Sequence, residues 1–233
     1  MNYTVTNSSA FPVVEVTLQP GEEVLIESGA MVYHNSLVKL ESKMNSNGGK
    51  GLGGLVKSVG RAITSSESMF ITTVTGLAVD GKVGIAPDTP GSIRELPIGQ
   101  TQWRLNDGAF FASDTTVGYD MKRQELGKAI FGKSGGLFVM ETTGYGQMLI
   151  NAYGDILEFE LDGKDPFVAD NMHVLAWSTS LNYNIKPGAK GFGLLTSGEG
   201  LVNEFVGRGT VLLQTRNKQG LAAMVSPYIT SKN

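Results

Sequence analysis

The sequence contains no cysteine among its 233 residues. Disulfide bonds, iron–sulfur clusters and thiol catalysis are thereby excluded, and a cytoplasmic location is expected. Only two histidines occur, His34 and His173, and they lie far apart in the sequence. A metal site would need both histidines together with carboxylates, so we expect neither a metal site nor a cofactor.

Excess charge and long apolar runs are also absent. The chain has 19 basic and 22 acidic residues, a net charge of −3. No general basic surface is available to grip phosphates, so we do not expect nucleic-acid binding. No apolar run approaches the ~18 residues of a membrane span. Residues 1–5 lack the basic start and apolar core of a signal peptide.

The sequence does contain a threefold internal repeat. Residues 24–33, 110–119 and 174–183 align without a gap, and each segment ends with an apolar residue followed two positions later by tyrosine. The three tyrosines are Tyr33, Tyr119 and Tyr183. A second repeated element covers 69–76, 137–144 and 201–207, and the first copy carries 18 extra residues before it. Residues 90–93 also resemble 153–156.

The repeat predicts the fold class. Apolar residues at every second position indicate strands with one buried face. Short strands separated by frequent turns are typical of an all-β barrel or sandwich. One copy cannot bury its own apolar face, so we expect three copies around a shared core. The chain is thus predicted to be a single domain, 1–233, with pseudo-repeats at about 13–98, 99–165 and 166–230 and a few short helices.

One motif suggests nucleotide chemistry. Residues 127–134 fit the phosphate-loop pattern G-x-x-x-x-G-K-[ST], with Lys133 as the lysine. A phosphate loop must leave a strand and open a helix. Here residues 120–126 are polar and helix-permissive, and a strand is expected after the motif. We therefore predict a connecting loop. No G-x-S-x-G elbow or other catalytic signature occurs, and we predict no catalytic residues.

A glycine-rich insertion at 48–63 has an apolar stripe at helical spacing. Its glycines weaken a helix, and its basic residues lie off the stripe. Two interpretations remain open, a helix that caps one end of the barrel or a surface for a protein or membrane partner. The candidate interaction residues are Leu52, Leu55, Val56, Lys57, Val59, Arg61 and Ile63.

Several stretches together resemble the altered-inheritance-of-mitochondria protein family. They are 51–55, 67–70, 90–93, 144–146, 152–154 and 207–216, in the family's order. The resemblance implies a double-stranded β-helix-like fold, as in the tryptophan RNA-binding attenuation protein, and a homotrimer. The chain looks like the short bacterial form, whereas fungal relatives are mitochondrial inner-membrane proteins. The family brings no catalytic or ligand residues to carry over.

Three functions remain open at this point. We expect a non-enzymatic oligomeric scaffold that meets a membrane surface or a protein partner. The first alternative is a binder of small molecules or RNA in grooves between the repeats, where the repeated tyrosines would stack on a ring. Spacing favours core or interface positions for these tyrosines. The second alternative is an enzyme without a recognisable motif.

Overall fold

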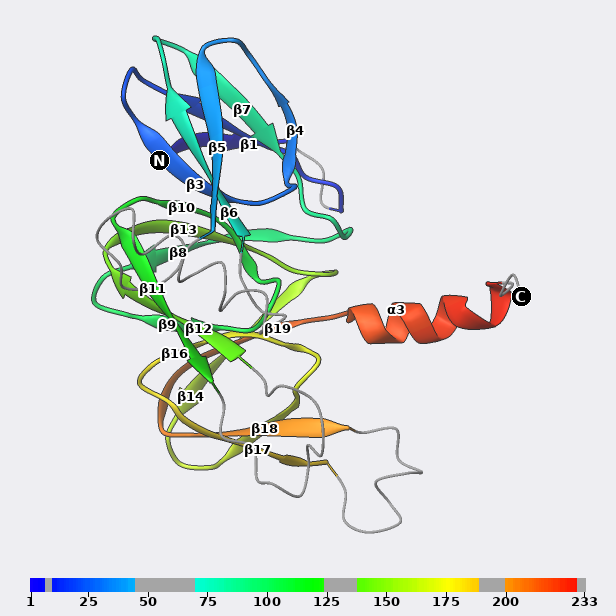
Figure 1. Cartoon of the computed structure of the whole chain (residues 1–233). Coiled ribbons are helices and arrows are strands. Elements are labelled where there is room, and N and C mark those ends of the chain that lie inside the picture. Colours follow the sequence, from blue (N-terminus) through cyan, green and yellow to red (C-terminus); the bar gives the residue numbers. More distant parts are fainter. Residues whose placement is uncertain (7–9, 45–69, 124–137, 189–199, 230–233) are drawn as a thin grey trace.

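The computed structural model describes residues 1–6, 10–44, 70–123, 138–188 and 200–229. Almost all of its regular structure is β-strand, which confirms the predicted all-β class (Figure 1). In the described part, no helix is long and apolar enough to cross a membrane.

The described part contains the following strands in chain order. They are β1 (Asn2–Val5), β2 (Val14–Leu18), β3 (Glu23–Glu27), β4 (Met31–His34), β5 (Val38–Met44), β6 (Phe70–Gly76), β7 (Gly81–Ile85), β8 (Ile93–Ile98), β9 (Trp103–Leu105), β10 (Phe110–Asp114), β11 (Val117–Arg123), β12 (Phe138–Gly144), β13 (Gly146–Asn151), β14 (Ile156–Asp162), β15 (Phe167–Asp170), β16 (Val174–Ser178), β17 (Asn182–Pro187), β18 (Leu201–Val206) and β19 (Arg208–Gln214). Helix α3 (Lys218–Val225) and the 3-10 turn η1 (Ser226–Tyr228) follow.

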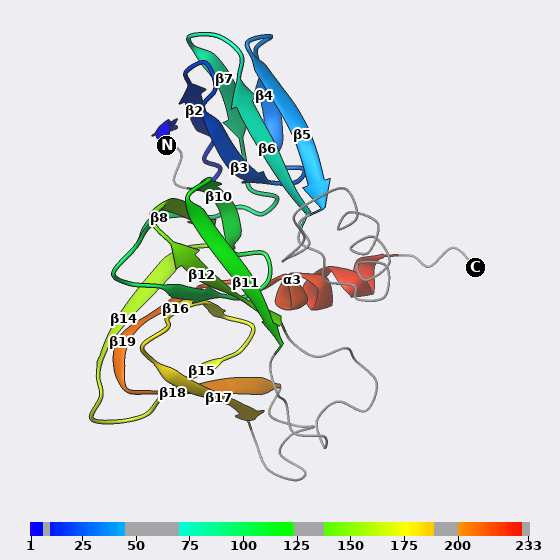
Figure 2. The ribbon, with the colours of Figure 1, turned by 60° about the vertical axis from the view of Figure 1, so that its left-hand side comes forward.

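After β1, the strands fall into three groups that share one antiparallel pairing pattern. The groups are β2 to β7 (unit 1), β8 to β13 (unit 2) and β14 to β19 (unit 3). In each unit the sixth strand pairs with the first and the third, and the fifth strand pairs with the second and the fourth. Figure 2 shows the three units following one another from top to bottom.

Neighbouring units are joined by strand pairing. The second strand of one unit pairs with the third strand of the next, as β3 with β10 and β9 with β16. Two six-stranded sheets therefore each span two units, while the end sheets are shorter, with orders β1-β2-β7-β4 and β15-β18-β17. Among the described strands no barrel closes, because each unit extends its sheet into the neighbouring unit.

The pairing registers show which residues correspond between units. Tyr119 lies opposite Thr142 and Tyr183 opposite Phe205, so these two tyrosines correspond as expected. Their counterpart in unit 1 is Leu40, opposite Val74, and the expectation that it is Tyr33 is wrong. The sequence alignment places the first copy seven residues too early, because two apolar strands, β3 and β4, follow each other there. The pairing registers place β8 in unit 2 and β14 in unit 3. The boundaries expected from the sequence, 13–98 and 99–165, instead place β8 in the first repeat and β14 in the second.

Each corresponding turn is fixed by a polar side chain at one repeated position. The Oδ1 atom of Asn35 accepts the amide of Lys82, Asp114 Oδ2 accepts that of Gln147, and Ser178 Oγ accepts that of Thr210. The three side chains differ in chemistry, but each accepts a hydrogen bond from the backbone amide at the same position of its unit. Because different residue types can fill this role, the repeat is weak in sequence and regular in structure.

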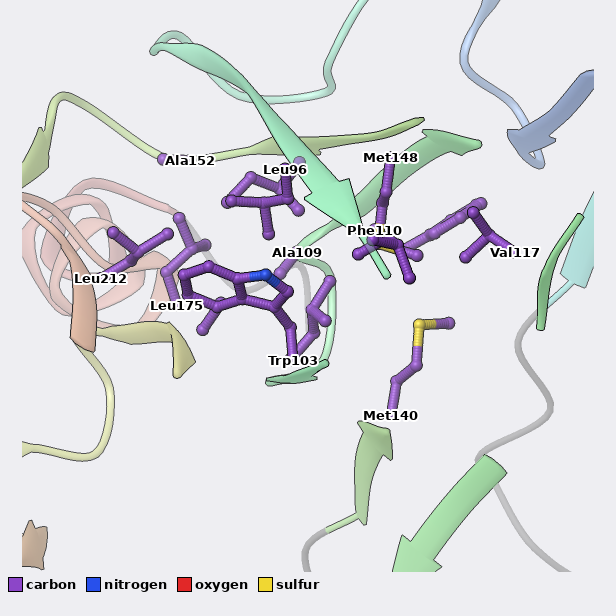
Figure 3. Packing of buried hydrophobic residues seen from close by; sticks show 14 of the residues in the cluster. Leu96, Trp103, Ala109, Phe110, Val117, Met140, Met148, Ala152, Leu175 and Leu212 are labelled. Carbon is purple, nitrogen blue, oxygen red and sulfur yellow. The ribbon is translucent and has the colours of Figure 1, made fainter. Parts of the chain in front are cut away.

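The apolar core is continuous from unit to unit. Three clusters of buried residues are present, and each contains residues from more than one unit. In the largest cluster Trp103 of β9 lies among Leu96, Leu175 and Leu212, which come from units 2 and 3 (Figure 3). Burial at these junctions depends on the neighbouring unit being present.

Candidate interaction surface

The interaction residues expected from the sequence lie outside the described residues. This holds for Leu52, Leu55, Val56, Lys57, Val59, Arg61 and Ile63, and for residues 127–134 of the phosphate-loop pattern. Of the residues 120–126 that were expected to be helix-permissive, Asp120 to Arg123 are described, and they continue strand β11. Strand β12 follows and pairs with β11, so the pattern lies between two strands of one ladder.

The repeated tyrosines do not form a common surface. Tyr183 packs in a core cluster, with its ring centroid 4.9 Å from that of Trp177. Tyr119 packs against the largest cluster, while Tyr33 is exposed on β4. The two tyrosines that correspond thus have packing roles. The described residues also contain no group of three histidine or acidic side chains that could hold a metal ion.

The described part has an incomplete edge at each end of the row of units. In units 2 and 3 the third strand, β10 or β16, pairs on one side within its own unit and on the other with the preceding unit. In unit 1 the third strand, β4, is the last strand of its sheet. At the other end, the second strand of unit 3, β15, is likewise the last strand of its sheet.

Side-chain exposure shows what the β4 edge lacks. Met31, Val32 and Tyr33 are 39%, 58% and 44% exposed. The residues at the corresponding positions of β10 and β16 are all at most 3% exposed. They are Phe110, Phe111, Ala112, Val174, Leu175 and Ala176. Three apolar positions that a preceding unit covers elsewhere are therefore open to solvent in unit 1.

At the opposite end of the row of units, apolar side chains are likewise exposed. Val168 at the β15 edge is 50% exposed. Ile71 is buried where unit 1 meets unit 2, and Val139 is buried where unit 2 meets unit 3. The corresponding residue of unit 3, Val202, is only half-buried. The two ends are thus open because their neighbours are absent, and they have complementary strand roles.

A polar cluster stabilises the β4 edge from within its own sheet. The Tyr33 hydroxyl donates to Glu15 Oε2 at 2.7 Å, and Lys82 Nζ lies 2.7 Å from Glu15 Oε1. The hydrogen bond from Lys82, followed by that from Tyr33, lowers the pKa of Glu15. The same contacts raise the pKa of Lys82 and of Tyr33. This exposed cluster joins three neighbouring strands and orients the tyrosine at the edge.

The joint between units 2 and 3 also contains polar contacts made by an arginine. Arg104 of β9 donates from Nε to Glu141 at 2.8 Å and from Nη1 to the carbonyl of Leu181 at 3.1 Å. Its guanidinium carbon lies 5.5 Å from the ring centroid of Tyr183. The position that corresponds to Arg104 in unit 3 is Val168, so the open β15 end is apolar at this position.

Comparison with known proteins agrees with this architecture. Residues 3–216 match the family described as "Mitochondrial biogenesis AIM24". The chain belongs to the AIM24 family. The match spans all three units and ends before α3.

Two streptococcal proteins are similar to this AIM24 chain. An uncharacterized protein of Streptococcus pyogenes serotype M6 is 44% identical over 234 residues, which cover 100% of this chain and 93% of that protein. A crystal structure of a Streptococcus pyogenes protein has a TM-score of 0.81 and 42% identity, and the similarity covers 98% of this chain and 99% of that one.

The two strand edges were missed in the sequence. The signal that could have revealed them is the correct alignment of Met31 with Phe110 and Val174, which requires the pairing registers. A second feature was also missed. Helix α3 and η1 form a C-terminal arm of this AIM24 chain, Lys218–Ile229, that projects from the β-structure (Figure 1).

Proposed function

We propose that this AIM24 protein is a non-enzymatic scaffold that works as a closed homotrimer, in which β4 of one copy pairs with β15 of the next. One observation carries the proposal. Met31, Val32 and Tyr33 are open to solvent, although the corresponding residues of units 2 and 3 are buried by the preceding unit. A second copy would supply the missing unit.

The internal junctions supply the register for this pairing. Ala112 lies opposite Ile26, and Ala176 lies opposite Leu105. The corresponding residues at the open ends are Tyr33 and Ala169, so these two face each other in the proposed joint. His34 then faces Val168. The two end sheets would merge into one sheet of order β1-β2-β7-β4-β15-β18-β17, with all pairs antiparallel.

The joint is head-to-tail, because it uses different surfaces on the two copies. Such contacts produce either closed rings or open fibres. An open chain of copies would leave two unpaired strand edges, which favour further addition and aggregation. Closure removes both edges. The number three follows the family resemblance, which implies a homotrimer.

The placement of charged groups supports a structural role. Three ion pairs connect neighbouring strands within a unit, namely Lys82 with Glu15, Lys186 with Glu204, and Arg104 with Glu141. A fourth pair, Arg94 of β8 with Glu158 of β14, connects units 2 and 3. One pair thus links two units and the other three link strands within a unit, an arrangement consistent with a rigid scaffold.

Native mass measurement tests the assembly. We expect three times 24.8 kDa, about 74 kDa, for the unmodified chain. Val32→Lys should give a monomer, because Val32 is exposed in the single chain and its lysine would have to be buried in the joint. Leu77→Lys is the matched control, since Leu77 is 56% exposed and lies after β6, in neither of the two strands that would pair. A mass of 24.8 kDa for the unmodified chain would refute the assembly.

A further inference from the structure

We infer that the C-terminal arm, Lys218–Ile229, is a lipid-binding element that enters the interfacial layer of a bilayer through apolar contact alone. The arm begins at a defined point. Asn217 caps α3, accepting the amide of Gly220 on its Oδ1 at 2.6 Å, and its Nδ2 lies 2.8 Å from His173 Nε2. The helix is therefore anchored to unit 3 at its first turn.

Beyond this anchor the arm has an apolar stripe without cover. No residue of α3 or η1 is buried. Leu221, Met224, Val225 and Tyr228 follow at i, i+3, i+4 and i+7, which places them on one helical face. Met224 is 64% exposed and Tyr228 is 85% exposed, and Ile229, which follows the turn, is also exposed. In Figure 1 the arm points away from the β-structure.

The chemistry of the arm favours lipid over a groove on another protein. From Gln219 to Ile229 there is no charged side chain. A helix that docks into a protein groove keeps a polar outer face in water, whereas the face opposite this stripe has Gln219, Ala223 and Ser226, small or uncharged residues. Tyr228 has an apolar ring and a polar hydroxyl, a combination that suits the boundary between acyl chains and headgroups.

Several arms acting together would give useful affinity, and this part rests on the proposed homotrimer. Cyclic symmetry places all three arms on the same side of the ring. One short arm would bind a bilayer weakly and reversibly, and three arms on one rigid body raise the overall affinity without any new contact. Because the arm has no charged side chain beyond Lys218 at its first turn, binding should not require anionic lipid.

Flotation with phosphatidylcholine vesicles tests the inference. The unmodified chain should float with these uncharged vesicles equally at low and at high salt. Met224→Ser combined with Tyr228→Ser should lower the bound fraction at least ten-fold while the native mass stays unchanged. Leu77→Ser with Val79→Ser removes two similarly exposed apolar residues at the β6–β7 turn and should bind like the unmodified chain.

Three results would overturn the inference. They are no flotation of the unmodified chain, equal flotation of the Met224/Tyr228 variant, or loss of binding at high salt. Native mass is measured on the same samples, which separates the two proposals. A trimer that does not float refutes the arm alone. A monomer that floats through the arm supports the arm and refutes the proposed assembly.

Discussion

Tyr33 of β4 lies opposite Gly84 of β7, and its ring occupies the space where a side chain at position 84 would stand. The corresponding residues of unit 2 are Ala112 and Leu149, where the small and the large residue are exchanged between the strands. The tyrosine thus lies flat across its neighbour strand at the open edge, and its hydroxyl reaches Glu15.

Gly84→Ala should displace the Tyr33 ring with little cost to the single chain. The ring is exposed and can swing outward, so we expect the free energy of unfolding to fall by no more than about 1 kcal/mol. The hydrogen bond to Glu15 should be lost. The dissociation constant of the trimer should rise at least ten-fold, because the edge changes shape. Urea unfolding and native mass at several protein concentrations measure the two effects. A large stability loss with an unchanged trimer would contradict this account of the edge.

Glu27 makes stability depend on pH. Burial, reinforced by Asp88, raises the pKa of Glu27 to about 7, against the opposing effect of Lys218. The folded chain therefore holds this proton in a range where the unfolded chain, with a pKa near 4.5, has released it. The stabilising contribution is full below about pH 4.5 and is lost as pH rises through about 7.

Glu27→Gln should remove this dependence. We expect the variant to be more stable than the unmodified chain at pH 8 by on the order of 1 kcal/mol, a value reduced because Glu27 is only half-buried and solvent screens it. Unfolding by urea at pH 5 and pH 8 measures the difference, with the exposed Asp165→Asn as control. Identical pH dependence in the Glu27 variant and the unmodified chain would show that Glu27 does not carry the effect.

Arg104 should contribute to the joint between units 2 and 3. Arg104→Lys keeps the charge but cannot reach Glu141, Leu181 and Tyr183 together, so we expect a loss of about 1–3 kcal/mol in unfolding free energy. A double-mutant cycle with Glu141→Gln separates the ion pair from the contacts to unit 3. Additive effects of the two substitutions would show that the pair is not coupled.

The insertion at 48–63 remains a predicted interaction element. Leu55→Ser with Val56→Ser should leave stability and native mass unchanged and should reduce flotation with anionic vesicles, because Lys57 and Arg61 accompany the stripe. The salt dependence of this binding distinguishes it from binding by the arm, whose apolar residues follow Lys218 without a further charge. Early melting or loss of the oligomer would instead show that the stripe packs within the protein.

Much of the fold could be predicted from local patterns, and the errors have a clear physical origin. Tyr119 and Tyr183 were aligned correctly, and so were Ile93 and Ile156, because both pairs lie in strands with the same alternation. Unit 1 was misplaced, because β3 repeats the apolar character of β4 only seven residues earlier.

The strand edges could not be predicted, because exposure depends on neighbours and not on residue type. Met31 and Phe110 are both apolar, yet one is exposed and the other buried, and only the pairing of β10 with β3 explains the difference. The C-terminal arm was missed for a related reason. Only the structure shows that its apolar residues are uncovered.

An engineered disulfide tests the central claim, the joint between β4 and β15, most directly. The chain has no cysteine, so His34→Cys with Val168→Cys introduces the only thiols. Residues directly opposite each other on antiparallel strands bring their Cβ atoms to about 4.5–5.5 Å, close enough for a disulfide with small adjustments. His34→Cys with Asp170→Cys is two residues out of register and is the control. The account predicts covalent trimers under mild oxidation for the first pair and little cross-linking for the second, whereas monomers for both pairs, or equal cross-linking by both, would contradict it.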